Sequence, residues 1–174
     1  HRVEESLCDP TVVQYTGYFG IEGSNKKYFF WFFESRKDPK NSPTVAWLTG
    51  GPGCSSMVAL FGENGPCTVS ENAEELIPNQ FSWTNEANMF WIDQPPGTGF
   101  SLGDLDSGET EVANDMYNFL QAFFTAMPQY NKNFYLFGES YAGHYLPAIA
   151  HRIFTSEKTD SVLIDFKGIG IGNG

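Results

Sequence analysis

Residues 133–144 constrain the fold more than any other part of the chain. A short aromatic and aliphatic run over residues 134–137 stops at Gly138, and Ser140 follows two residues later. This order is typical of a strand that turns sharply into a helix and carries a serine on the turn. The strained turn needs small neighbours, and Gly138 and Ala142 are small, although the usual G-x-S-x-G pattern has glycine in place of Ala142. The segment therefore predicts a nucleophile elbow at Ser140.

Strand patterns alternate with helix patterns along the chain, which predicts an α/β protein with a mixed, mostly parallel sheet flanked by helices. Apolar residues recur at helical spacing between Val112 and Met127, Ser107 or Thr110 is the expected N-cap, and Pro128 ends the helix. Residues 62–85 are expected to be irregular. The predicted strands cover residues 12–21, 27–34, 44–48, 88–93, 134–137 and 162–171, and a second helix covers 141–154.

Composition limits the classes of partner. The net charge of −11 and the pI near 4.5 argue against nucleic acid or an anionic membrane. Nothing in the sequence calls for a metal or another cofactor. Three cysteines, Cys8, Cys54 and Cys67, leave two interpretations open: buried free thiols, or a disulfide with at least one partner outside these residues.

The last residues suggest that the chain is incomplete. Gly172-Asn173-Gly174 follow a predicted interior strand directly, without a terminal element. We therefore expect residues 1–174 to be the N-terminal portion of a larger domain. The same expectation follows from the histidines: His144 and His151 lie on the helix that leaves the elbow, so we interpret both as structural, and the general base is expected beyond Gly174.

A glycine-rich loop, residues 50–53, follows the predicted strand 44–48. At a nucleophile elbow, one oxyanion donor is the backbone amide of the next residue, here Tyr141, and the other comes from such a loop. A plain Gly-Pro turn is the alternative interpretation of this loop. Asp93 precedes the serine in the chain, where no triad acid is expected, and we interpret it as a structural acid at a strand end.

The two glycine-rich segments together resemble a known family. Trp47-Leu48-Thr49-Gly50-Gly51-Pro52-Gly53-Cys54-Ser55-Ser56 and Gly138-Glu139-Ser140-Tyr141-Ala142-Gly143 are similar to the signature blocks of the serine carboxypeptidases. Three further blocks match in the same order: Glu63-Asn64-Gly65-Pro66, the stretch from Asp93 to Ser101, and Gly172-Asn173-Gly174.

The resemblance implies an α/β-hydrolase fold, a vacuolar, lysosomal or secreted protein, and removal of C-terminal residues from peptides. It implies Ser140 as nucleophile and Gly51 and Tyr141 as oxyanion donors. It assigns Thr49, Gly50, Glu63 and Glu139 to the substrate's C-terminal carboxylate, with threonine where many members have asparagine. The triad Asp and His and a partner for Cys54 are expected downstream.

Other functions within reach of these residues are an acyltransferase, a lipase or esterase, and an inactive homologue that acts as a binding or protective protein. Paired acids beside the elbow suit a neutral ester poorly, and the intact Ser140 disfavours an inactive protein. If a carboxylate binds between two glutamates, one of them must be protonated, because like charges in contact raise a carboxyl pKa. We therefore expect substrate affinity to fall as pH rises.

Overall fold

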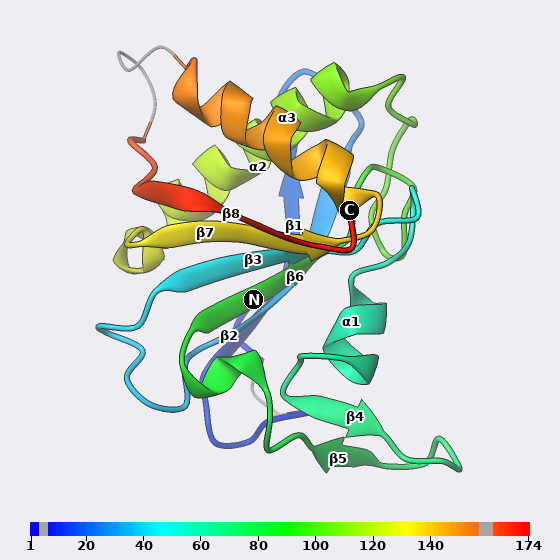
Figure 1. Cartoon of the computed structure of the whole chain (residues 1–174), viewed down its shortest axis with the longest axis vertical. Helices are drawn as coiled ribbons and strands as arrows, with labels where there is room; N and C mark the ends of the chain where they lie inside the picture. Colours follow the sequence, from blue (N-terminus) through cyan, green and yellow to red (C-terminus); the bar gives the residue numbers. More distant parts are fainter. Residues whose placement is uncertain (4–6, 157–161) are drawn as a thin grey trace.

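The computed structural model describes residues 1–3, 7–156 and 162–174, which form a central sheet with helices on both faces (Figure 1). The sheet contains β1 (Gln14–Gly20), β2 (Lys27–Phe33), β3 (Thr44–Leu48), β6 (Asn88–Ile92), β7 (Phe134–Glu139) and β8 (Phe166–Gly172). The helices are α1 (Met57–Gly62), α2 (Glu109–Ala126) and α3 (Ala142–Phe154), with short 3₁₀ turns at Trp83–Asn85 and Pro128–Tyr130.

Strand order in the sheet is β1-β2-β6-β3-β7-β8. The pairs β1–β2 and β2–β6 are antiparallel, and β6, β3, β7 and β8 are parallel. The mixed, mostly parallel sheet predicted from the sequence is thus confirmed. Because β3 and β7 are parallel neighbours, Leu48 at the carboxyl end of β3 lies beside Gly138, one residue before the end of β7, and both strands lead into the glycine-rich segments.

The core has two parts, one on each face of the sheet. α2 and α3 cover one face, and α1 with a small two-stranded sheet covers the other (Figure 1). On the first face, the ring of Phe123 stacks on Phe90 with centroids 4.5 Å apart. On the second, Trp47 and Trp91 pack with Met57 and Leu60 of α1. All five residues of β3 are buried because both faces are covered, which explains the four apolar residues that follow Thr44 in this strand.

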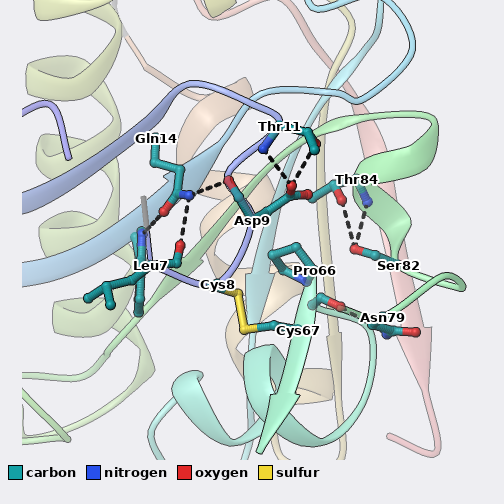
Figure 2. Close-up of a disulfide and its surroundings, with 12 residues drawn as sticks. Leu7, Cys8, Asp9, Thr11, Gln14, Pro66, Cys67, Asn79, Ser82 and Thr84 are labelled. Atoms are coloured by element: carbon teal, nitrogen blue, oxygen red, sulfur yellow. Dashed lines mark hydrogen bonds between the residues drawn. A yellow bond between two sulfur atoms is a disulfide. The ribbon is translucent and has the colours of Figure 1, made fainter. Parts of the chain in front are cut away.

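A disulfide joins Cys8 to Cys67 across the second face (Figure 2). The interpretation of these two cysteines as free thiols is therefore wrong, while Cys54 is free and exposed. Arg36 reinforces the same junction, since its guanidinium donates to Asp9 Oδ2 at 2.7 Å and to the Pro66 carbonyl at 3.0 Å. The amino-terminal segment is thus fastened to the strand that Cys67 begins.

Three features differ most from the prediction. The stretch expected to be irregular contains the paired strands β4 (Cys67–Val69) and β5 (Leu76–Pro78). The N-cap of α2 is Gly108 rather than Ser107 or Thr110, because Glu111 accepts from both the amide and the hydroxyl of Ser107 and so turns that residue away from a capping role. The final strand begins at Phe166, after the Asp165 carboxylate accepts from the Asn133 amide.

No helix among the described residues is both long and apolar enough to cross a bilayer.

Candidate active site

The turn between β7 and α3 has the geometry of a nucleophile elbow. Ser140 has φ 54°, a left-handed conformation that non-glycine residues rarely adopt, and it is exposed at the carboxyl end of β7. A side chain at Gly138 would collide with the Leu48 carbonyl and lie 2.8 Å from the Ala142 Cβ. The small residues predicted around the elbow are therefore required by close packing against β3. The Ser140 amide is also fixed, because it donates to the Gly172 carbonyl at 2.9 Å.

The loop after β3 lies directly against the elbow. A Cβ added to Gly50 would collide with the backbone nitrogen of Tyr141 and lie 3.1 Å from the Ser140 Cβ. Gly51 follows with φ 112° and is exposed, and the Cys54 amide donates to the Gly50 carbonyl at 3.1 Å to close the turn. The structure thus brings the Gly50 backbone against Tyr141 and Ser140, and Gly51 follows Gly50 in the same turn.

Asp93 locks this loop to the next one along the sheet. Its carboxylate accepts from the Ser55 hydroxyl at 2.6 Å, from the Ser56 amide at 2.9 Å and from the Phe100 amide at 2.9 Å. The Asp93 carbonyl accepts from the Ser101 hydroxyl at 2.6 Å. The side chain is fully buried, so these bonds compensate its lost solvation. The interpretation of Asp93 as a structural acid is confirmed.

Two carboxyl groups meet at the edge of the site. Glu63 follows α1 and Glu139 ends β7, so one carboxyl comes from a helix end and the other from a strand end. Partial desolvation, the charge of Glu139 and a hydrogen bond between the two carboxyls all raise the pKa of Glu63. Such a hydrogen bond needs a proton on one carboxyl. The pair is thus suited to hold a proton that could be donated to an anion.

Thr49 lies between the loop and the core. Its hydroxyl accepts from the Trp47 indole at 3.2 Å, and its amide donates to the Ser56 hydroxyl at 3.1 Å. A hydroxyl that accepts one hydrogen bond still has its own proton to donate. The residue is buried, so its orientation is set by the fold.

The histidines do not form a serine–histidine pair in the described part of the chain. The ring of His144 stacks on Tyr141 with centroids 4.6 Å apart, and His151 is exposed on α3. Among the described residues, no hydrogen bond reaches the Ser140 hydroxyl.

The sequence reading missed a charged cluster at the start of α2. The Lys26 ammonium donates to Asp106 at 2.6 Å, Asp115 at 2.7 Å and Glu111 at 2.8 Å, and the lysine is only 7% exposed. Burial, and after it the charge of Asp115, raise the pKa of Asp106 to about 6, against the lowering effect of Lys26. The spacing of Glu111 and Asp115, one helical turn apart, was the available signal.

Sequence comparison with known proteins identifies one family. A profile of the family described as Serine carboxypeptidase matches residues 6–174. The chain is 51% identical over 167 residues to serine carboxypeptidase-like 48 of Arabidopsis thaliana, covering 92% of the chain and 32% of that relative. It is 45% identical over 168 residues to carboxypeptidase Y homolog A of Arthroderma otae, covering 95% of the chain and 30% of the relative. The chain thus spans about a third of the length of these curated relatives.

Solved structures agree with the fold. The structure of Kex1(Δ)p, a prohormone-processing carboxypeptidase from Saccharomyces cerevisiae, superimposes with a TM-score of 0.85 at 32% identity, over 94% of this chain and 40% of that one. An esterase from Thermogutta terrifontis superimposes with a TM-score of 0.53 at 14% identity, over 90% of this chain and 44% of that one. The second likeness concerns the fold alone.

Proposed function

The chain belongs to the serine carboxypeptidase family, and from that premise we propose that the whole protein removes C-terminal residues from peptides through an acyl-enzyme on Ser140. The observation that carries the proposal is the left-handed Ser140 at the carboxyl end of β7, with the Tyr141 amide held against Gly50. An exposed hydroxyl on such a turn is placed for attack on a carbonyl carbon.

In the proposed reaction, the Ser140 hydroxyl gives its proton to a general base and bonds to the carbonyl carbon of the last peptide bond. The carbonyl oxygen becomes negative and receives hydrogen bonds from the amides of Gly51 and Tyr141. The departing amino acid takes the proton, and water then hydrolyses the ester. The base and its acidic partner are supplied by the part of the whole protein outside residues 1–174.

We assign the substrate's terminal carboxylate to Thr49, Gly50, Glu63 and Glu139. The raised pKa of Glu63 supports this assignment, because a neutral carboxyl donates a hydrogen bond to an anion while an ionised one repels it. The Thr49 hydroxyl provides a second donor. Binding of a free C-terminus is therefore expected to weaken as pH rises and Glu63 ionises.

Residues 1–174 constitute, in this proposal, the N-terminal portion of an α/β-hydrolase domain. We expect the isolated chain to be inactive, because neither His144 nor His151 is placed as a base. We also expect it to be insoluble or molten, because the outer edge of β8 has no paired strand among the described residues. A cooperative thermal transition of the isolated chain would contradict the second expectation.

The Cys8–Cys67 disulfide favours an oxidising compartment, and the proposed carboxyl pair favours an acidic one. We therefore assign the protein to the vacuole or lysosome, or to secretion. The proposed substrates are peptide C-termini. The test below must distinguish a carboxypeptidase from the two alternatives, an acyltransferase and an inactive homologue.

The test uses the full-length protein and its Ser140→Ala variant. We expect the wild type to release the C-terminal residue of a peptide acid, to act poorly on the matching peptide amide, and to react with a fluorophosphonate probe. Ser140→Ala is expected to lose both hydrolysis and labelling. Hydrolysis that survives Ser140→Ala would refute the proposed nucleophile, and labelling without hydrolysis would favour an acyltransferase.

A further inference from the structure

The side chain of the residue after the elbow serine is tied to a different helix. The Tyr141 hydroxyl donates a hydrogen bond to Glu109 Oε1 at 2.6 Å. Glu109 is the first residue of α2, and Tyr141 immediately precedes α3. The bond therefore links the amino-terminal ends of the two helices that cover one face of the sheet.

This hydrogen bond completes the immobilisation of a ring that is only partly buried. The Tyr141 ring stacks on His144, with centroids 4.6 Å apart and planes at 23°. It meets Tyr145 edge-on, with centroids 5.2 Å apart. These contacts fix the plane of the ring, and the bond to Glu109 fixes its tip. A side chain held at its tip restricts rotation of its own backbone.

Glu109 is itself well placed for this role. The Lys26 cluster anchors α2 two residues further on, through the bond to Glu111. The hydrogen bond from Tyr141 is the main cause that lowers the pKa of Glu109, so the acceptor is a carboxylate at neutral pH. A charged acceptor forms a shorter and stronger bond than a neutral one.

We propose that Glu109 is a positioning residue, which holds the Tyr141 amide in the orientation that receives the oxyanion by fixing the Tyr141 side chain. The inference rests on the proposed function, since it needs Tyr141 as an oxyanion donor. Donors of this kind lose effect when they move by a fraction of an ångström or turn by 10–20°. Gly50 lies directly against the amide, and Glu109 holds the far end of the Tyr141 side chain.

The experiment compares variants of the full-length protein on a peptide acid. Glu109→Ala removes the acceptor, and we expect kcat to fall by about 5- to 10-fold with KM nearly unchanged, the size typical of one lost hydrogen bond. Glu109→Gln keeps an acceptor oxygen without the charge and is expected to keep at least half of kcat. Tyr141→Phe should match Glu109→Ala, and the double variant should show no further loss.

A matched control separates positioning from stability. Tyr130 makes a similar bond to Glu34 at 2.7 Å, but it lies beyond the far end of α2. Tyr130→Phe should lower the unfolding temperature without changing kcat. Wild-type kcat in Glu109→Ala, or additive losses in the double variant, would overturn the inference while leaving the proposed function intact. A wild type that does not hydrolyse peptide acids would instead refute the proposed function.

Discussion

Removing the Cys8–Cys67 disulfide is expected to lower the free energy of unfolding by about 4 kcal/mol, the chain-entropy value for a closed loop of about 60 residues. The two cysteines are 59 residues apart in the sequence. Without the disulfide, the conformational entropy of the unfolded chain increases, because the loop between the two cysteines is no longer closed.

The folded state should change much less than the unfolded state. Arg36 still bonds to Asp9 and to the Pro66 carbonyl, each next to one of the cysteines, and these bonds keep the two segments docked. The Gln14 amide also holds the carbonyls of Leu7 and Asp9 (Figure 2). The predicted loss therefore comes mainly from the unfolded chain.

Urea unfolding of the full-length protein, followed by tryptophan fluorescence, tests this prediction. Cys8→Ala, Cys67→Ala and the double variant should have nearly the same lowered midpoint, because each one eliminates the same bridge. In these variants, the free energy of unfolding should fall more steeply with urea concentration than in the wild type, because the unfolded chain without the disulfide is more expanded. Losses that add between the two single variants, or a midpoint equal to that of the wild type, would refute the reasoning.

Four further predictions concern charge and close packing. Lys26→Met leaves three acids without their cation and should destabilise the protein by about 3 kcal/mol or more at pH 7, as measured by urea unfolding. Burial raises the pKa of Asp106 from 3.8 to about 6, so the free energy of unfolding of the wild type should fall as pH rises between those values. The Asp106→Asn variant should lose less stability over the same range. Parallel profiles of unfolding free energy against pH would contradict this prediction. For the carboxylate site, calorimetry on the Ser140→Ala protein should show that its affinity for a peptide acid falls as pH rises. The Ser140→Ala, Glu63→Gln double variant should show a much smaller fall, because glutamine stays neutral. Equal pH dependence of the two proteins would remove Glu63 from the carboxylate site. Gly138→Ala should lower the melting temperature strongly, because the new Cβ would collide with the Leu48 carbonyl. The control Gly62→Ala places its Cβ in open space and should have a much smaller effect. Equal melting temperatures of the two variants would show that the elbow tolerates a side chain.

Local patterns were enough to predict the elbow and the central strands. The small residues around Ser140 follow from backbone strain, and the apolar run after Thr44 in β3 follows from burial on both faces. The short pair β4–β5 was missed because each strand has three residues, and the residues of β5 are all exposed. Such a pair has no apolar period long enough to detect.

Contacts between distant segments were harder to predict. An odd number of cysteines does not reveal which two pair, so the bridge between Cys8 and Cys67 required the fold. The same applies to Lys26, which meets Asp106 and Asp115 from about 80 and 90 residues away. Of the acids in the polar stretch before α2, Asp106 turns inward, because it meets Lys26 immediately before β2.

The position of β3 has a consequence during protein synthesis. This strand pairs with β6 on one side and with β7 on the other, and β7 begins 90 residues after β3. At the usual ribosomal rate, that stretch takes about 5–18 s to translate. Throughout this interval, the nascent strand Thr44–Leu48 has at least one edge unpaired, and until β6 has been made from Asn88 onward it has both edges unpaired. During this interval, a ribosome-associated chaperone that binds apolar segments could bind Thr44–Leu48. The codons between β3 and β7 would set the length of the interval, because they set the rate of translation.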